Sequence, residues 1–359
     1  MKYDMPVRVY EEAGCVLRHA AEIGALGSCA LIVTGRTSAR TCGALSDVQQ
    51  ALEQVSLDWT LFDEVEENPS IGTVVRGSEC GRQASADLVI AIGGGSAMDA
   101  AKAIAVLMAN EGAGPDFLDE QIPDAAQLPV VAVPTTCGTG SEVTGVAVLT
   151  RHEKKTKGSM AHRVYPRLAL LDVRYLKAAP EAILRNTAAD AFAHMVESWL
   201  NTNATDFSRA FVREGMRLWT KAKPVLLGER DPVEEDLRAL LLASTYAGMA
   251  IAHTGTSLPH GLSYDITYRL GIAHGKACAY FLGGYLAEAK EEQTDALYKL
   301  CGFCDAKEVG DFLDRSLTLS PLPKNLLQQT ANNLRKNEAK LKNCPFPVDE
   351  DVLGRIAGL

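Results

Sequence analysis

Up to Asp172 the chain alternates short apolar runs with helical patterns, and this alternation constrains the fold more than any other feature. The apolar runs are rich in β-branched residues and lie at 29–35, 59–65, 86–95, 128–136 and 167–173. Helical patterns such as RTCGALSDVQQALEQV and SAMDAAKAIAVLMAN separate several of them. Because strands with almost no polar alternation are buried on both faces, we expect a mostly parallel sheet covered by helices.

After Asp172 the pattern changes to long helices, with no convincing strand among them. The helical patterns lie at 180–202, 207–222, 233–253 and 280–301. Pro180 is suited to the start of the first of these helices, which places the boundary near Lys177–Pro180. We therefore predict an α/β domain over residues 1–178 and an all-α domain over residues 179–359, with a cleft between them.

Composition limits the classes of partner. The 359 residues are 47% apolar and 23% charged, which is typical of a soluble globular protein. A net charge of −9 argues against binding to nucleic acid or to an anionic membrane surface. The N-terminus lacks the apolar core of a signal peptide, and no apolar run approaches ~20 residues, so we expect a cytoplasmic protein with no membrane partner. The nine cysteines are scattered and odd in number, which predicts free thiols.

Four potential metal ligands lie in the second half of the chain. Asp190 and His194 are four residues apart, so on a helix they share one face with Cβ atoms ~5–6 Å apart. His260 and His274 are fourteen residues apart, and a straight helix would separate them by about 21 Å. They can converge only if the chain turns back, for which Gly271 is suited. Three imidazoles and a carboxylate suit Fe²⁺ or Zn²⁺, whereas either pair alone is more typical of a structural pair.

A glycine loop follows the third predicted strand. Gly93, Gly94, Gly95 and Ser96 lead directly into a helix, whose first N–H groups could bind a pyrophosphate that approaches without Cβ clashes. The loop is not the G-x-G-x-x-G fingerprint, and a tight turn of purely geometric use is the alternative. We place Asp99 in the first turn of that helix, where it either stabilises the helix or bonds a ribose or carboxamide of the cofactor.

A second loop, VAVPTTCGTGSEVTG, has the same character. It places the hydroxyls of Thr135, Thr136, Thr139, Ser141 and Thr144 around two glycines just after a strand. Hydroxyls and free N–H groups at the carboxyl end of a strand are typical of a dinucleotide crevice. The alternative is a plain Thr/Gly-rich turn.

Taken together, GGGSAMDAAKA, PTTCGTGSEVT, the Asp190/His194 helix and the PHG…AHG segment resemble the iron-containing (group III) alcohol dehydrogenase family. The similarity runs from VTGRTSARTCGAL through FDEVEENPS to the C-terminal helices. It implies a dinucleotide-binding α/β domain and a helical domain that binds metal and substrate. It also implies reversible hydride transfer between NAD(P)H and a small alcohol, diol or aldehyde, with the metal polarising the substrate oxygen.

The resemblance also implies roles for individual residues. The metal ligands would be Asp190, His194, His260 and His274. The cofactor contacts would include Gly93, Gly94, Gly95, Ser96, Asp99, Thr135, Thr136, Ser141, Thr144 and Lys157.

The chain departs from the family pattern at two positions. Tyr264 replaces a histidine that many relatives have four residues after the third ligand, and a tyrosine can donate a hydrogen bond or join a proton relay only at a higher unperturbed pKa. Cys137 replaces a small apolar residue and could offer an oxidisable thiol near the cofactor.

Cofactor choice is indicated by the residues after the first predicted strand. An NAD-specific protein would often place an acid there, but this chain has Gly35 and Arg36, with Arg40 nearby. Glycine leaves room for a 2′-phosphate and arginine can pair with it, so we predict NADP(H) over NAD(H). Ordinary helix-start residues are the alternative. Fe²⁺ accommodates a fifth position for substrate readily, while Zn²⁺ would bind such ligands at least as tightly, so both metals remain open.

Three other functions stay open at this point. A glycerol-dehydrogenase-like enzyme could use the same scaffold. A dehydroquinate-synthase-like lyase would need clustered basic residues, of which Arg269 is the clearest near the ligands. A non-catalytic metal or nucleotide sensor could share both sites but would oxidise no NADPH with any aldehyde. We expect a homo-oligomer, namely a dimer.

Overall fold

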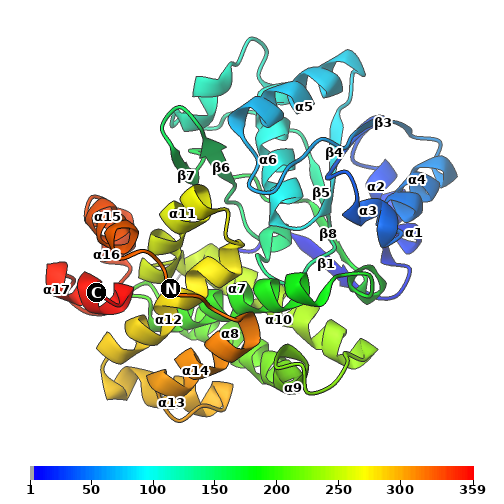
Figure 1. Cartoon of the computed structure of the whole chain (residues 1–359). Coiled ribbons are helices and arrows are strands. Elements are labelled where there is room, and N and C mark those ends of the chain that lie inside the picture. Colours follow the sequence, from blue (N-terminus) through cyan, green and yellow to red (C-terminus); the bar gives the residue numbers. More distant parts are fainter. Residues whose placement is uncertain (1–3) are drawn as a thin grey trace. The chain divides into compact units, whose positions relative to one another are not determined.

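The computed structural model of the chain describes residues 4–359, which form two compact units. The α/β unit comprises residues 5–136 and 141–179, and the helical unit comprises residue 4 with residues 137–140 and 180–359. Figure 1 shows the sheet within the first unit and helices alone in the second. None of the helices among the described residues combines the length and apolarity needed to cross a membrane.

The α/β unit is built on a six-stranded sheet in which all neighbouring strands are parallel. The strand order is β1-β8-β5-β4-β2-β3, and a separate antiparallel hairpin pairs β6 with β7. The strands are β1 (Arg8–Glu11), β2 (Cys29–Thr34), β3 (Asp58–Phe62), β4 (Leu88–Gly93), β5 (Val130–Pro134), β6 (Val148–Arg151), β7 (Thr156–Ser159) and β8 (Leu168–Leu171). All five predicted runs are strands, whereas β1, β6 and β7 were missed. The glycine loop therefore follows the fourth strand of the chain, not the third.

Helices cover both faces of this sheet, as predicted. Leu31 of β2 lies in one core together with Ile104 of α6, while the next residue, Ile32, lies in the other core with Val48 of α4. Alternate residues of one strand thus enter different cores, which is the pattern of a sheet buried on both sides. The helices of this unit are α1 (Cys15–Arg18), α2 (Ala20–Gly24), α3 (Ser38–Thr41), α4 (Ala44–Gln54), α5 (Ile71–Gln83) and α6 (Gly95–Ala109).

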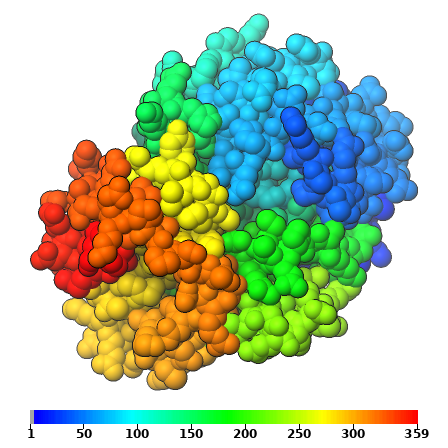
Figure 2. Space-filling model, in the orientation of Figure 1, coloured from blue at the N-terminus to red at the C-terminus, as the bar shows by residue number. Residues whose placement is uncertain are grey.

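The helical unit contains the long helices expected after Pro180. Its helices are α7 (Glu181–Leu200), α8 (Asp206–Trp219), α9 (Lys223–Leu226), α10 (Glu234–Thr254), α11 (Leu258–Leu270), α12 (His274–Glu288), α13 (Glu291–Cys301), α14 (Ala306–Leu317), α15 (Lys324–Leu334), α16 (Glu338–Lys342) and α17 (Glu350–Ala357). The prediction of one helix over 280–301 was wrong, because the chain leaves helical geometry at Ala289 and Lys290. The residues of α14 to α16, coloured orange, form part of the unit's outer surface in Figure 2.

Close packing of α12 on α7 depends on one glycine. A Cβ atom added to Gly275 would lie 1.8 Å from the carbonyl oxygen of Asn186, so any other residue would push the two helices apart. His274 is the residue before Gly275 and begins α12. The glycine therefore holds His274 close to the α7 segment that carries Asp190.

Candidate functional site

The four predicted metal ligands come from three helices of the helical unit. Asp190 and His194 lie on one face of α7, and the Nε2 atom of His194 is 4.0 Å from Oδ1 of Asp190. Helix α11 carries His260 and ends at Gly271, whose φ of 64° is the left-handed conformation that glycine favours. The predicted chain reversal at Gly271 is thus present, and it brings the rings of His260 and His274 to a centroid distance of 5.3 Å.

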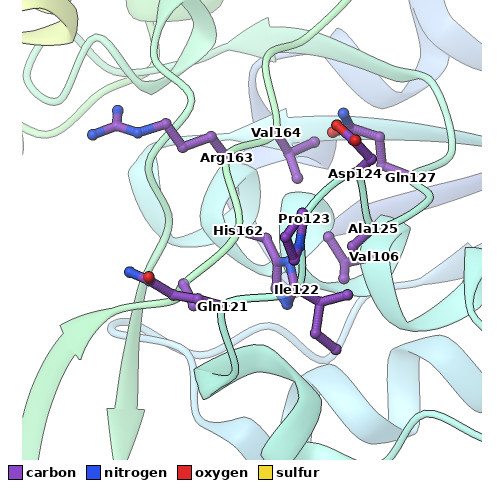
Figure 3. A pocket seen from close by; sticks show the side chains of 11 residues that line it. Val106, Gln121, Ile122, Pro123, Asp124, Ala125, Gln127, His162, Arg163 and Val164 are labelled. Atoms are coloured by element: carbon purple, nitrogen blue, oxygen red, sulfur yellow. The ribbon is translucent and has the colours of Figure 1, made fainter.

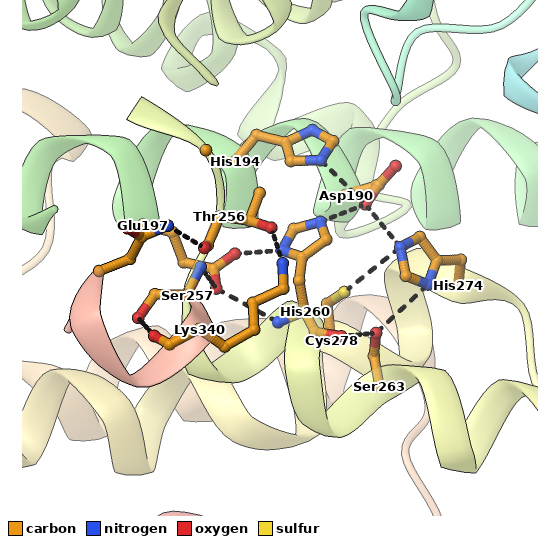
Figure 4. A network of polar contacts seen from close by, with 12 residues as sticks. Asp190, His194, Glu197, Thr256, Ser257, His260, Ser263, His274, Cys278 and Lys340 are labelled. Carbon is orange, nitrogen blue, oxygen red and sulfur yellow. Dashed lines mark hydrogen bonds and ion pairs between the residues drawn. The ribbon is translucent and has the colours of Figure 1, made fainter. Parts of the chain in front are cut away.

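These side chains gather around one carboxylate oxygen. Oδ1 of Asp190 lies 3.3 Å from Nε2 of His260 and 3.9 Å from Nε2 of His274. The ring of His194 stacks on that of His260, with centroids 4.3 Å apart (Figure 4). Ligands bonded to a single Zn²⁺ ion at ~2.0–2.3 Å lie at similar distances from one another.

Because this cluster is buried, each of its polar atoms needs a hydrogen-bond partner or a bound ion. Asp190 is 3% exposed and His260 is 2% exposed, yet Oδ1 of the first and Nε2 of the second have no hydrogen-bond partner. Leaving such an atom unsatisfied costs ~1–3 kcal/mol. A divalent cation would satisfy both atoms, so the donor set fits an ion of the Fe²⁺ or Zn²⁺ type.

The electrostatics of Asp190 and His194 also suit a cation. Burial raises the pKa of Asp190, but the neighbouring imidazoles, first that of His194, outweigh it and leave the pKa below its usual value. Burial lowers the pKa of His194 to about 4. The carboxylate is therefore anionic and this imidazole neutral at neutral pH, which are the protonation states that bind metal.

Glu197 supports His260 and was missed by the sequence reasoning. It is fully buried on α7, and its Oε1 accepts hydrogen bonds from the backbone N–H groups of Ser257 (2.9 Å) and His260 (3.2 Å). Its Oε2 pairs with Nδ1 of His260, which directs Nε2 of that ring toward Asp190. A carboxylate behind a ligating histidine fixes its orientation and raises its basicity. The only sequence signal was an acid three residues after His194 in a largely apolar helix.

Glu197→Gln is expected to weaken metal binding by about 10–100-fold, the usual effect of losing such a supporting carboxylate. The amide keeps the size of the side chain but not the charge that holds the His260 ring. The dissociation constant of Zn²⁺, measured by competition with a chromophoric chelator, checks this. Glu181→Gln is the matched control, because Glu181 lies on the same helix but is exposed and pairs with Arg185. Equal affinities in the two variants would contradict the role given to Glu197.

Tyr264 lies beside the cluster. Its ring stacks on that of His274, with centroids 5.7 Å apart and planes inclined by 19°. Lys340, which the sequence reasoning did not single out, places its Nζ 5.5 Å from the centre of the Tyr264 ring and donates to Oγ1 of Thr256. The position of Tyr264 is compatible with a proton relay, and that role stays a prediction.

In the α/β unit, the glycine loop has the backbone that a phosphate site needs. Gly93 has a φ of 151°, and a Cβ on Gly94 would lie 2.9 Å from Oγ1 of Thr136. Gly94 caps α6 without any side-chain hydrogen bond, so the first N–H groups of the helix face no capping side chain. Oγ1 of Thr135, at the end of the neighbouring strand β5, is buried without a hydrogen-bond partner. These groups fit an anionic ligand at the N-terminus of α6.

Asn68 links two of the predicted cofactor residues. Its backbone N–H donates to Oγ of Ser96 at 3.0 Å, and its side-chain oxygen accepts from Nζ of Lys157. Lys157 is buried on β7 of the hairpin. Ser96 and Lys157 are therefore neighbours in the folded unit, although 61 residues (157 − 96) separate them in the sequence.

Three other predicted cofactor residues form an internal network around Lys102. Nζ of this fully buried lysine donates to the Oγ (2.6 Å) and the carbonyl (2.7 Å) of Ser141 and lies 3.4 Å from Oγ1 of Thr144. The Ser141 hydroxyl in turn donates to Oδ1 of Asp99 at 2.8 Å. Asp99 is the fifth residue of α6, so its predicted place in the first turn was wrong. Burial raises the pKa of Asp99 and lowers that of Lys102 to about 8.

The residues after β2 are largely open to solvent. Gly35 is partly buried and Arg36 is exposed, while Arg40 pairs with Asp63 at 2.7 Å.

In the helical unit, Cys137 is buried with its Sγ 3.3 Å from Oγ1 of Thr187, and burial raises its pKa to about 11. A thiol that stays protonated is a poor candidate for an oxidisable group.

A cavity of about 440 Å³ in the α/β unit lies away from these residues. Figure 3 shows it between the 121–127 segment and residues 161–164. Its His162 is held by the carbonyl oxygen of Phe117 at 2.6 Å and stacks on that ring. None of the predicted site residues lines this cavity, and it carries no functional assignment.

Comparison with known proteins supports the family resemblance that was seen in the sequence. The family described as iron-containing alcohol dehydrogenase matches residues 6–173, and the C-terminal part of the Fe-containing alcohol dehydrogenase family matches residues 185–340. The sulfoacetaldehyde reductase of Bilophila wadsworthia is 28% identical over 351 residues, which cover 95% of this chain and 90% of that protein. The lactaldehyde reductase of Escherichia coli is 31% identical over 70% of this chain and 66% of its own length.

The solved structures support the same family assignment. The crystal structure of an iron-containing alcohol dehydrogenase from Thermotoga maritima has a TM-score of 0.91 and 32% identity, over 100% of this chain and 99% of that one. These relatives are alcohol dehydrogenases and aldehyde reductases, so the glycerol-dehydrogenase-like, lyase and sensor alternatives are not favoured. The family implies a metal and a nicotinamide cofactor. This chain is an oxidoreductase of alcohols and aldehydes, and it belongs to the iron-containing alcohol dehydrogenase family.

Proposed function

We propose that this enzyme interconverts a small aldehyde and its alcohol, with NADPH as the preferred hydride donor and Asp190, His194, His260 and His274 as the metal ligands. The observation that carries the proposal is the buried cluster in which Asp190 Oδ1 and His260 Nε2 lack hydrogen-bond partners. A divalent ion bound there supplies a Lewis acid that polarises the substrate carbonyl. Relatives named for sulfoacetaldehyde, lactaldehyde and 1-propanol support a small substrate.

The α/β unit binds the cofactor in this proposal. The N–H groups at the start of α6 and the unpaired hydroxyl of Thr135 hold the pyrophosphate. Asp99, Ser141 and Thr144 act through the buried network with Lys102, which fixes the second loop against α6. Lys157 and Ser96, both bonded to Asn68, complete the polar edge of this site.

The test of this function joins metal analysis to turnover. We expect about one equivalent of a transition metal per chain by elemental analysis. We also expect NADPH oxidation in a screen of short aldehydes, and its loss on chelation with recovery on adding Fe²⁺ or Zn²⁺. A protein that binds NADPH but oxidises it with no aldehyde would contradict the proposal. A homodimer and a cytoplasmic location stay predictions.

Cofactor preference is tested by Gly35→Asp. A carboxylate after β2 would repel a 2′-phosphate and could bond the ribose hydroxyls of NADH, and like charges brought together cost several kcal/mol. We therefore expect the ratio of kcat/KM for NADPH over NADH to fall by at least about tenfold, equivalent to 1.4 kcal/mol. Gly114→Asp is the control, because Gly114 is exposed in the same unit and a side chain there would contact nothing. A wild-type preference for NADH would overturn the assignment.

A further inference from the structure

Cys278 lies inside the ligand cluster, although the sequence reasoning did not single it out. It is fully buried on α12, four residues after His274, so both side chains emerge from one face of the helix. Its Sγ is 4.0 Å from Nε2 of His274. One ligand atom from each of Asp190, His260, His274 and Cys278 can be chosen so that all lie within 4.8 Å of one another. Figure 4 shows the sulfur between the two histidine rings.

A buried cysteine usually serves as a small apolar residue, and its surroundings here argue against that use. Here a carboxylate oxygen and two imidazole nitrogens lie within 4.8 Å of its sulfur. Oδ1 of Asp190 and Nε2 of His260 are both buried, belong to the same cluster and lack hydrogen-bond partners, which points independently to a bound cation.

The distances also suit coordination by sulfur. Two ligands bonded to one Zn²⁺ ion, at ~2.0–2.1 Å for nitrogen and ~2.3 Å for sulfur, can lie no more than about 4.4 Å apart. The separation of 4.0 Å between Sγ and Nε2 of His274 already meets this limit. The chosen atoms of Asp190, His260, His274 and Cys278 lie within 4.8 Å of one another, a set that does not include His194, so small side-chain rotations would bring these four atoms onto one ion.

We propose that Cys278 is a further ligand of the metal and gives the site a preference for Zn²⁺ over Fe²⁺. Soft thiolate ligands favour zinc, and the general affinity order already places Zn²⁺ above Fe²⁺ for nitrogen and oxygen donors. The inference rests on the proposed metal site and adds a sulfur donor to it.

The main test replaces the metal with Co²⁺, whose spectrum reports on bound sulfur. The apoenzyme is reconstituted with Co²⁺, and we expect a near-ultraviolet sulfur-to-cobalt charge-transfer band. Cys278→Ser should lose this band while still binding cobalt through Asp190 and the histidines. Cys301→Ser should keep it, because Cys301 is also buried on a helix of this unit but bonds the carbonyl of Tyr298. A band that persists in Cys278→Ser would overturn the proposal.

Two further measurements make the result decisive. X-ray absorption of the wild-type zinc enzyme should show a sulfur neighbour at ~2.3 Å, and this needs no variant to fold. In competition with equal Fe²⁺ and Zn²⁺ under anaerobic conditions, the bound zinc-to-iron ratio should fall about tenfold or more in Cys278→Ser, as for the loss of about 1.4 kcal/mol of selective binding. A zinc or cobalt enzyme with only nitrogen and oxygen neighbours would refute the sulfur ligand and leave the proposed function intact. A wild-type protein that binds neither metal would refute both.

Discussion

His260→Ala is expected to release the metal and abolish aldehyde reduction, lowering kcat/KM by on the order of 10³ or more, since even one lost oxyanion donor costs ~10²–10³. The reason is geometric. Nε2 of His260 is the imidazole nitrogen nearest to Oδ1 of Asp190, and Glu197 holds its ring in place. Removing the imidazole also leaves the Glu197 carboxylate buried without its side-chain partner. His274→Ala should likewise release the metal and abolish turnover.

The measurements are metal content after dialysis, NADPH oxidation and NADPH affinity by fluorescence titration. We expect the first two to collapse and the third to change little, because the proposed cofactor residues lie in the α/β unit. His253→Ala is the control, since His253 lies in the helical unit on α10 and bonds the carbonyl of Met249. Full metal occupancy with normal turnover in His260→Ala would refute the ligand assignment.

The central strands were predicted correctly because their amino-acid composition is typical of strands that are buried on both faces. Strands β2, β4 and β5 are almost continuous β-branched and apolar residues, as expected for strands covered on both faces. Strand β1 lies at the sheet edge, and its sequence RVYE mixes polar and apolar residues with no fully buried position. The hairpin strand β7, TKGS, is likewise short and polar. Such strands are defined by their hydrogen-bonded partners, which local composition does not reveal.

Helix ends were predictable only where a residue marks them. Gly271 ends α11 in a left-handed conformation, and that signal was sufficient to predict the convergence of His260 and His274. The break between α12 and α13 falls at Ala289 and Lys290, which are ordinary helix formers. No local signal distinguished that break from a continuous helix.

Supporting polar residues were the hardest part of the site to predict. Glu197, Lys102 and Cys278 are all fully buried. The local sequence does not show whether a charged residue or a thiol in a helix is buried. Each is defined by partners that lie far away in the sequence: His260 for Glu197, Ser141 for Lys102, and Asp190 for Cys278. Spacing along one helix therefore identified Asp190 and His194 as candidate ligands, whereas only the fold identified the buried residues beside the ligands.

The Lys102 network gives the largest expected effect on stability. Lys102→Met should lower the free energy of unfolding by about 3 kcal/mol, the usual loss when one member of a buried charged network is removed. The change removes the Lys102 donor from the Ser141 carbonyl and removes the stronger of two cationic partners, Lys102 and Lys157, from the Asp99 carboxylate. The midpoint of urea unfolding measures the loss. Lys154→Met is the control, because Lys154 is exposed and its pair with Asp119 should contribute ~0–1 kcal/mol.

The pH dependence of that loss separates a charged lysine from a merely well-packed one. Burial lowers the pKa of Lys102 to about 8, so between about pH 8 and its unfolded value of 10.5 the unfolded chain binds more protons than the folded one. The lysine's contribution to stability therefore rises with pH across this window, and the gap between wild type and Lys102→Met should widen there. Asp99→Asn should lessen the loss when combined with Lys102→Met, since the carboxylate left behind is the main source of it. If the gap stays constant across the window and the two losses simply add, Lys102 stabilises the loop by packing alone and the buried charge network has no energetic role.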